Sequence, residues 1–267
     1  MKSKSTLEIP IYRFENGSLH ERKDVLAIEE PLEIKMKYFL NGNSIEKNIS
    51  ITMRTPGNDH ELSCGFLFTE GIISDYNQIK KIAQLSENST VIELKEGITP
   101  IENKLERNFY TTSSCGVCGK ASIDAITTVS NFKIENKFIR PDSSIILSLP
   151  EKLSKQQEIF KSTGGLHASA LFDLSGEFIE LREDVGRHNA LDKLIGSMLI
   201  QNNIPLSKSI LLLSGRASFE LIQKASMAGI PIVVAIGAPS SLALELAKEF
   251  GITLIGFLRG DKYNLYC

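Results

Sequence analysis

Cys115 and Cys118, separated by two residues, are the side chains of this sequence with the clearest potential for chemistry. They lie in the segment 112-TSSCGVCGKAS-122, among serines and glycines, in a chain that has four cysteines in total. A C-x-x-C pair can bind zinc, form a redox-active disulfide, or carry a sulfur atom as a persulfide on one thiol. Residues elsewhere in the chain favour some of these chemistries over others.

A zinc ion requires three or four nitrogen or sulfur ligands in a tetrahedral array. The sequence has one C-x-x-C motif, so further ligands would have to be His167 or His188, far along the chain. A zinc deaminase carries an H-x-E motif before P-C-x-x-C. Here 167-HAS-169 lacks the glutamate and follows the cysteines, and no proline precedes Cys115. These departures weigh against zinc.

A thioredoxin-like redox pair is expected beside a βαβ unit at the start of a small domain, whereas this pair lies in the middle of the chain. A sulfur carrier instead needs an accessible thiolate. A helix predicted over 121–130 and the nearby Lys120 would both lower the pKa of a thiol in this segment. The second cysteine could then assist or release the sulfur by thiol exchange. From the residues alone, all three chemistries stay open.

A second group of candidate residues follows three apolar segments that we predict to be strands, at 209–213, 232–236 and 253–257. Such continuous apolar strands, alternating with helices, indicate a parallel sheet covered on both faces. Ligands bind beyond the carboxyl ends of parallel strands. The residues at these ends are Ser214, Gly215, Arg216, Ser240, Arg259, Gly260 and Asp261.

Arginine pairs well with phosphate, and a helix N-terminus after Ser240 would favour an anion. These strand ends therefore predict a site for a phosphate-bearing ligand such as a nucleotide. The alternative is that the glycines form ordinary turns and the arginines are solvated. The chain has neither a Walker loop nor G-x-G-x-x-G, which argues against ATPase and dinucleotide dehydrogenase chemistry.

Histidines in two further turns are candidates for the same site. His167 follows a Gly-Gly pair and opens a predicted strand, and Arg187-His188 opens a predicted helix after Gly186. Neighbouring carboxylates could orient either imidazole or accept hydrogen bonds from a ligand's ring nitrogens. A structural role for each histidine is about equally plausible.

The first third of the chain predicts β structure. Residues 32–40 and 44–53 flank the turn 41-NGN-43 and predict a hairpin. We expect Asp59 to cap a helix that ends before Gly71, and a strand at 91–95. Further along, 166–182 predicts a hairpin and 188–200 a helix, with a domain boundary in the polar stretch 131–144. The expected domains are a β-rich N-terminal region, 1–135, and an α/β domain, 136–267.

Composition narrows the class of protein. The 267 residues carry a net charge of −2 with 42% apolar residues, which suits a globular protein and not a general nucleic-acid-binding surface. The N-terminus lacks the apolar region of a signal peptide, and no apolar run is long enough to span a membrane. We therefore expect a cytoplasmic protein with reduced thiols and neither nucleic acid nor membrane as a partner.

With these features in place, most of the chain resembles the formate dehydrogenase accessory sulfurtransferases, the FdhD family. The resemblance rests on seven blocks in the family's order: 61-ELSCGFLFTEGII-73, 113-SSCGVCGK-120, 163-TGGLHASAL-171, 183-EDVGRHNALDKLIG-196, 214-SGRASFELIQKASMAGIP-231, 238-APSSLALELA-247 and 256-GFLRGDK-262.

The resemblance implies a sulfurtransferase that accepts persulfide sulfur from a cysteine desulfurase. It would pass the sulfur to the molybdenum or tungsten of a bis-pterin guanine dinucleotide cofactor, which is bound as substrate and serves formate dehydrogenase. It also implies a homodimer, a core similar to the cytidine-deaminase fold, and no structural metal. The alternatives are a zinc-dependent hydrolase of the deaminase class and a cofactor chaperone that moves no sulfur.

The resemblance assigns the persulfide to Cys115, makes Cys118 its partner, and places cofactor binding on Phe257, Leu258, Arg259, Gly260, Asp261 and Lys262. We add, from the turns they occupy, His167, Arg187, His188, Ser214, Gly215, Arg216 and Ser240 as further cofactor-binding candidates.

Overall fold

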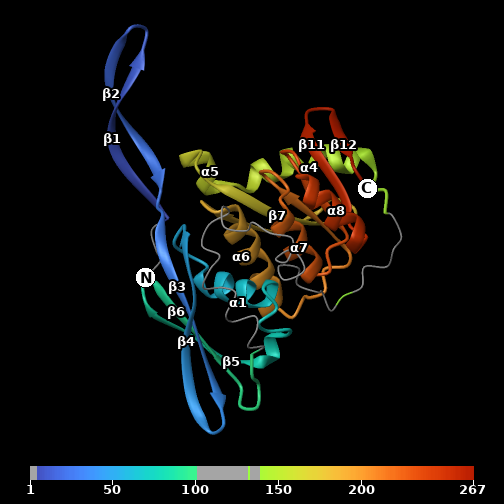
Figure 1. Ribbon diagram of the computed structural model, residues 1–267. Coiled ribbons are helices and arrows are strands. Elements are labelled where there is room, and N and C mark those ends of the chain that lie inside the picture. Colours follow the sequence, from blue (N-terminus) through green and yellow to red (C-terminus); the bar gives the residue numbers. More distant parts are fainter. Residues whose placement is uncertain (1–4, 101–131, 133–138) are drawn as a thin grey trace.

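The computed structural model describes residues 5–100, 132 and 139–267, which form a mixed α/β structure with strands in three sheets (Figure 1). Cys115, Cys118, the helix expected over 121–130 and most of the expected domain boundary lie outside these residues. The division into domains at 135 therefore stays a prediction. No helix within the described ranges is both long and apolar enough to cross a membrane.

The N-terminal hairpin predicted around 41-NGN-43 is confirmed and is longer than expected. Strands β3 (Glu30–Leu40) and β4 (Asn43–Arg54) pair antiparallel, and Asn41 and Gly42 form the turn with positive φ angles of 51° and 80°. Positive φ at both central residues is what a tight hairpin turn requires, and asparagine and glycine tolerate it best. Leu32, Ile34 and Met36 alternate inward on β3 and are fully buried.

The predicted strand at 91–95 is also confirmed, as β6 (Ser89–Leu94), which runs parallel to β3. It completes a four-stranded sheet with β5 (Ile79–Ser86), in the order β4-β3-β6-β5. A short 3-10 helix, η1 (Tyr76–Gln78), leads into β5. Strand β5 and a separate hairpin formed by β1 (Thr6–Glu15) and β2 (Ser18–Ala27) were not predicted from the sequence.

Helix α1 (Asp59–Thr69) confirms the first predicted helix, but the predicted cap is wrong. Asp59 is the first helical residue, and the capping position belongs to Asn58, whose side chain makes no capping bond. The Asp59 carboxylate instead accepts hydrogen bonds of 2.9 and 3.0 Å from the buried Arg54 guanidinium. A buried guanidinium needs a paired anion, and this requirement outweighs a capping bond. The helix ends before Gly71, as predicted.

The second half of the chain is built on a six-stranded mixed sheet in the order β12-β11-β10-β9-β7-β8. The three predicted strands are confirmed as parallel neighbours, and the predicted hairpin at 166–182 is confirmed as the antiparallel pair β7–β8. The strands are β7 (His167–Asp173), β8 (Phe178–Asp184), β9 (Ser209–Leu213), β10 (Ile232–Ala235), β11 (Thr253–Arg259) and β12 (Lys262–Leu265).

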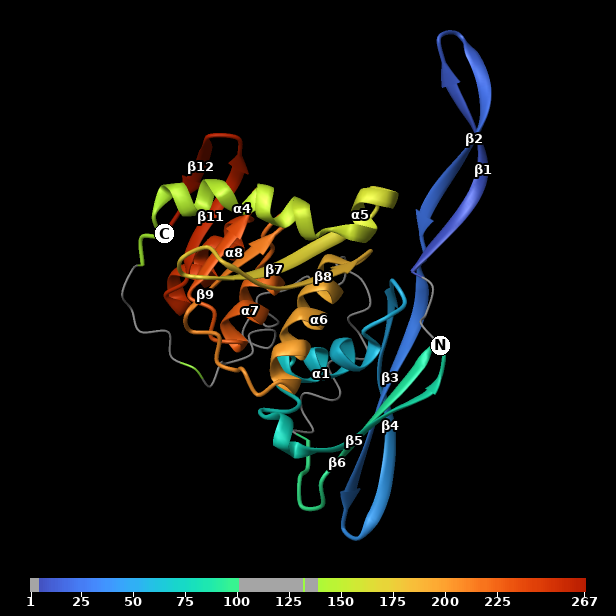
Figure 2. The ribbon, with the colours of Figure 1, turned by 180° about the vertical axis from the view of Figure 1, so that it is seen from behind.

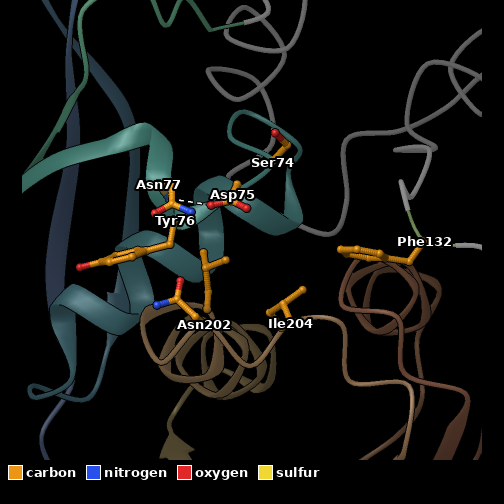
Figure 3. Close-up of a pocket in the computed structure, with 8 residues that line it drawn as sticks. Ser74, Asp75, Tyr76, Asn77, Phe132, Asn202 and Ile204 are labelled. Atoms are coloured by element: carbon orange, nitrogen blue, oxygen red, sulfur yellow. Dashed lines mark hydrogen bonds between the residues drawn. The ribbon is translucent and has the colours of Figure 1, made fainter.

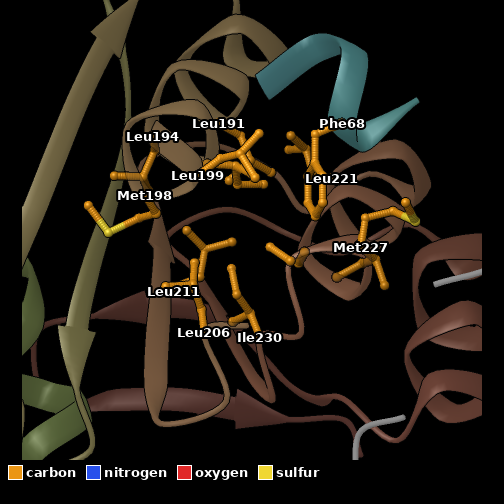
Figure 4. Packing of buried hydrophobic residues seen from close by; sticks show 14 of the residues in the cluster. Phe68, Leu191, Leu194, Met198, Leu199, Leu206, Leu211, Leu221, Met227 and Ile230 are labelled. Carbon is orange, nitrogen blue, oxygen red and sulfur yellow. The ribbon is translucent and has the colours of Figure 1, made fainter. Parts of the chain in front are cut away.

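Helices cover both faces of this sheet, as predicted (Figures 1 and 2). One face packs against α6, α7 and α8 in a core that also includes α1, and Figure 4 shows its centre. The other face packs against α4, which the sequence analysis missed. The helices are α4 (Ser143–Gln156), α5 (Glu158–Thr163), α6 (Arg187–Ile200), α7 (Phe219–Met227) and α8 (Ser241–Phe250).

The two halves of the chain meet where α1 crosses α6. A Cβ atom on Gly65 would lie 1.8 Å from the backbone oxygen of Asp192, and one on Gly196 would lie 1.9 Å from that of Glu61. Only glycine allows the two backbones to approach this closely. The crossing therefore fixes α6 against the N-terminal sheet.

Candidate functional site

The register of the six-stranded sheet brings most of the predicted site residues to one edge. His167 opens β7 and pairs with Asp184 at the end of β8, so α6 begins beside it. Ser169 of β7 pairs with Leu213 at the end of β9, which places the segment after β9 at the same edge. His167, Arg187-His188 and Ser214-Gly215-Arg216 are therefore gathered from three separate parts of the chain.

The segments that follow β9, β10 and β11 interlock at this edge, and we call residues 214–217, 237–240 and 256–257 the rim. Gly237 donates its N–H to the oxygen of Gly215 at 2.9 Å, and Phe257 donates to the oxygen of Gly237 at 3.0 Å. A Cβ atom on Gly237 would lie 2.9 Å from the oxygen of Gly215. The glycines thus let three strand ends pack directly against one another, as the sequence analysis expected of their carboxyl ends.

Two serines of the rim have structural roles. The Ser214 hydroxyl accepts a 2.8 Å hydrogen bond from the N–H of Ala168, which extends the pairing of β7 with the segment after β9. The Ser240 hydroxyl accepts a 3.2 Å bond from the N–H of Ala243 and caps α8. Both hydroxyls keep a proton that can be donated to a ligand.

Arg187 is the residue whose surroundings point most clearly to a ligand. Its Nε is buried and, within the described residues, has no hydrogen-bond partner. The residue is also the first of α6, where the helix dipole is unfavourable for a cation. A buried guanidinium nitrogen without a partner is costly, so this position calls for an anion from outside the described residues.

The two other candidate arginines also lack a counter-ion among the described residues. Arg54 and Arg182 are each held by carboxylates elsewhere in the fold. In the part of the chain that the structure describes, Arg187, Arg216 and Arg259 form no ion pair. Arg216 and Arg259 are exposed. At the edge, Arg187 and Arg216 therefore carry positive charge that no described carboxylate pairs with, and this charge suits a phosphate group.

Both histidines are held in the neutral state near pH 7. Burial lowers the pKa of His167, and the charge of Arg187 lowers it further. Burial, Arg187 and Lys224 together lower the pKa of His188 to about 4, against the opposing charge of Glu220. The His188 Nε2 lies 3.5 Å from the Ser218 hydroxyl and 3.8 Å from a Glu220 carboxylate oxygen. Neutral imidazoles can both donate and accept hydrogen bonds, as contacts to a heterocyclic ring require.

The segment 257–262 lies only partly at the rim. Phe257 is there, in the left-handed conformation with φ 55° and with its side chain 41% exposed. Leu258 is buried in the core beneath α4, so its side chain faces away from any ligand at the edge. Arg259, Gly260, Asp261 and Lys262 form the β11–β12 turn, which projects beyond the body of the molecule (Figure 1).

A buried polar network beneath the rim supports the start of α6. Lys193 binds the Asp184 carboxylate at 2.7 Å and the backbone oxygen of Thr55 at 2.8 Å. The same carboxylate accepts hydrogen bonds from the N–H groups of Thr55 and Gly186. The Asn189 side-chain amide donates a further hydrogen bond of 3.3 Å to it. Asp184 is fully buried, and these contacts compensate its negative charge.

A second buried cluster joins α1, α6 and α7. Lys224 binds Asp192 at 3.1 Å, Glu70 at 2.9 Å and the Thr69 hydroxyl at 2.9 Å. Burial opposes the charge of Lys224, but the two carboxylates outweigh it and raise the Lys224 pKa. Burial raises the pKa of Asp192 to about 6. Neither network was predicted from the sequence. The pattern that could have indicated them is the presence of charged residues on the otherwise apolar faces of the helices.

Among the described cysteines, Cys64 and Cys267 offer no reactive thiol. Cys64 is fully buried in the core, which raises its thiol pKa to about 12. Partial burial also raises the pKa of Cys267. No group of three or more potential metal ligands occurs within the described residues. Cys115 and Cys118 lie outside them, so the choice among their chemistries rests on other observations.

Two cavities lie away from the rim. One of about 290 Å³ is lined by Phe132, Tyr76 and Ile204 among others, with Asp75 already bonded to the N–H of Asn77 (Figure 3). The other, of about 400 Å³, lies between the β4–α1 loop and α5, next to Lys193 and Glu183. The Glu183 carboxylate caps the first turn of α5. In both cavities the carboxylates named here already accept hydrogen bonds from the backbone, so neither cavity is a candidate catalytic site.

Comparison with protein families identifies the chain. Residues 27–267 match the model of the FdhD/NarQ family. The chain belongs to this family. FdhD proteins with the curated name sulfur carrier protein FdhD are similar over nearly the whole length. One from Streptomyces avermitilis is 47% identical over 266 residues, which is 96% of this chain and 92% of the relative. One from Sulfolobus acidocaldarius is 45% identical over 97% of this chain and 95% of the relative.

A solved structure shares the fold. A protein from Desulfotalea psychrophila, provisionally described as a formate dehydrogenase accessory protein, superposes with a TM-score of 0.71 at 23% identity. The match covers 98% of this chain and 97% of that one. The α/β architecture described above is therefore shared with that protein. The curated relatives place the chain in a family whose members are named sulfur carrier protein FdhD.

Proposed function

We propose that this FdhD protein accepts sulfur as a persulfide on Cys115 from a cysteine desulfurase and transfers it to a molybdenum or tungsten bis-pterin guanine dinucleotide cofactor, thereby activating formate dehydrogenase. Membership of a family whose relatives are named sulfur carriers supports the transfer of sulfur. The pyrophosphate groups of such a cofactor would supply negative charge for the rim arginines, and its guanine rings would supply hydrogen-bond partners for the histidines.

The observation that carries cofactor binding is the buried Arg187 Nε, which has no hydrogen-bond partner among the described residues and lies beside a rim of glycines. A phosphate oxygen there would satisfy a buried donor and balance the charges of Arg187 and Arg216. Neutral His167 and His188 lie at the same edge and can hydrogen-bond to heterocycle edges. Phe257 offers an exposed aromatic face for a planar ring.

The proposed sulfur transfer balances without an external oxidant. The Cys115 thiolate attacks the terminal sulfur of the desulfurase persulfide, and the donor cysteine leaves as a thiolate. Cys118 then attacks the Cys115 sulfur, which forms a Cys115–Cys118 disulfide and releases sulfide to the metal of the bound substrate. A cellular thiol must reduce this disulfide before the next cycle.

The remaining parts of the proposal follow the family resemblance: action in the cytoplasm, contact with both cysteine desulfurase and formate dehydrogenase, and a core similar to the cytidine-deaminase fold. No second activity is favoured by a described residue. A zinc hydrolase would need Cys115 and Cys118 plus a histidine, and both described candidates for that histidine already lie beside Arg187, whose positive charge disfavours a nearby metal cation.

Maturation of formate dehydrogenase by cysteine variants tests this proposal. A Cys115→Ala protein should bind the guanine nucleotide as the wild type does and should fail to activate formate dehydrogenase. Cys64→Ala is the matched control, because Cys64 is buried in α1, and it should retain activation. Full activation by Cys115→Ala would favour a cofactor chaperone and overturn the transfer of sulfur.

A further inference from the structure

Helices α6 and α7 both begin at the edge that carries the rim. Arg187 and His188 are the first two residues of α6, and Ser218, directly after the rim segment 214–217, immediately precedes α7. The His188 Nε2 lies 3.5 Å from the Ser218 hydroxyl. The spacing between these two helix starts therefore sets where His188 lies relative to a ligand at the rim.

Two contacts, one helical turn apart, join α6 to α7. His188 and Asp192 are four residues apart on α6 and so lie on one face of the helix, and Glu220 and Lys224 are spaced in the same way on α7. The first contact joins His188 to Glu220, with 3.8 Å between Nε2 and the carboxylate oxygen. The second joins Asp192 to Lys224, with 3.1 Å between the carboxylate and the ammonium group. Because both contacts involve the same two helix faces, a shift at the second also moves the first.

The contact between Asp192 and Lys224 is buried and is held from a third helix, α1. The two side chains are 2% and 7% exposed. The Lys224 ammonium donates to the Thr69 hydroxyl and to a Glu70 carboxylate oxygen, each at 2.9 Å, and lies 5.5 Å from the centre of the Phe66 ring. The Thr69 hydroxyl in turn donates to Asp192 at 2.7 Å. Lys224 is therefore fixed by residues of both α1 and α6.

Stability alone does not account for charges at this position. Replacing a buried ion pair by apolar residues of similar volume often leaves stability unchanged or increases it. Apolar side chains already surround the pair, since Leu191 of α6 and Leu221 of α7 are buried in the same core (Figure 4). A lysine here therefore indicates an effect on a group outside the core.

His188 is a group on which Lys224 acts through its charge as well as through the helices. Burial and Arg187 contribute most to lowering the pKa of His188, to about 4, and Lys224 contributes next. Glu220 and Glu70 act in the opposite direction. Without Lys224, these two carboxylates would be opposed by Arg187 alone, and His188 would take up a proton more readily.

We propose that Lys224 is a positioning residue for ligand binding at the rim, which holds the imidazole of His188 in place through the contacts between α6 and α7. This inference rests on the proposed binding of a cofactor that carries both phosphates and a heterocycle. A neutral imidazole donates from one nitrogen and accepts at the other, as the edge of a purine ring requires. A protonated imidazole would instead favour a phosphate oxygen, which the rim arginines already suit. Lys224 thus directs His188 to the ring of the ligand.

Calorimetric titration with two probes, GDP and inorganic pyrophosphate, tests this role at pH 7.5. Lys224→Met should weaken GDP binding by about 3- to 10-fold, within the range for a hydrogen bond between neutral groups, and leave pyrophosphate binding unchanged. His188→Gln should do the same. Lys224→Met/His188→Gln should bind GDP no more weakly than His188→Gln, because both changes remove one contact. Lys248→Met, on the exposed side of α8, is the matched control. Losses that add, or an equal loss of pyrophosphate binding, would overturn the proposal.

An NMR titration of His188 decides the same question without a ligand. The variant Lys224→Met/Asp192→Asn removes both members of the buried pair and serves if Lys224→Met folds poorly. In either protein the pKa of His188 should rise from about 4 towards the ordinary value of about 6.5. A pKa that stays at the wild-type value would overturn the proposal. A wild type that binds no GDP, or that carries no sulfur on Cys115, would contradict the proposed function and leave this measurement decisive for Lys224.

Discussion

Arg187 is the side chain with the largest electrostatic effect on the residues beside the rim. It opens α6, lowers the pKa values of two histidines, and has a buried Nε without a partner among the described residues. The N-terminus of a helix is the positive end of its dipole, so a cation there is unfavourable, and no neighbouring residue in the sequence explains it. An anionic ligand gives this placement a physical reason.

Loss of the Arg187 guanidinium should therefore weaken nucleotide binding. Arg187→Ala should raise the dissociation constant for GDP, used as a probe, by about 10- to 100-fold, the range for a hydrogen bond to a charged group. Arg140→Ala is the matched control, an exposed arginine near the start of β11 and far from the rim. Calorimetric titration measures both, and equal affinities for the two variants would contradict this role.

His188 should titrate well below an ordinary histidine. Its pKa is lowered to about 4, so the folded protein keeps it neutral while the unfolded chain takes up a proton near the ordinary value of about 6.5. The unfolded state therefore binds more protons between these values, and the free energy of unfolding falls as the pH drops from 6.5 to 4.

His188→Gln should make that fall less steep, as measured by urea unfolding across this pH range. Leu174→Gln, an exposed substitution that removes no titratable group, should leave the slope unchanged. An NMR titration that placed the His188 pKa above 6 would refute the assignment.

At the scale of elements, the crossing of α1 and α6 holds the rim against the N-terminal sheet. Gly65→Ala and Gly196→Ala each place a methyl group within 2 Å of a backbone oxygen of the facing helix. The helices must then separate, which should cost about 1–3 kcal/mol of unfolding free energy or more. Gly165→Ala is the control, because the nearest atoms lie 3.9 Å from the position that its added methyl group would occupy. Urea denaturation curves that coincide for all three variants would contradict the role of the crossing.

The ion cluster between α1, α6 and α7 provides a second test at this scale. Lys224→Met leaves Asp192 buried without its cation and should cost about 3–5 kcal/mol. The double variant Lys224→Met/Asp192→Asn should recover part of that loss, since the charge that remains unpaired, on Glu70, is partly exposed to solvent. Lys248→Met, on the exposed side of α8, should be close to neutral. A double variant no more stable than Lys224→Met would argue against ion pairing as the cause.

Across the whole molecule, local sequence patterns predicted some elements and not others, for identifiable reasons. Asn41-Gly42 and the apolar strands before the rim carry strong local signals, so the first hairpin and the parallel strands could be predicted. Helix α4 was missed because Pro150 lies within it and its buried side recurs only at Ile146, Leu149 and Leu153. The hairpin of β1 and β2 was missed because neither strand has a buried face.

The site was predictable only in outline. Strand ends located the rim, because carboxyl ends of parallel strands converge whatever their sequence. The burial of Leu258, the neutral state of His188 and the compensation of Asp184 depend on partners far away in the sequence, such as Thr55 for Asp184. No local pattern contains these contacts.

Mass spectrometry of the peptide that contains Cys115 and Cys118 tests the central claim most directly. The protein would be incubated with a cysteine desulfurase and free cysteine, alkylated, and digested. Sulfur carriage predicts one added sulfur on Cys115 that a reductant removes, and no addition to the buried Cys64 of the same molecule. A peptide that stays unmodified with several desulfurases, in a protein that still binds GDP, would contradict the proposed transfer.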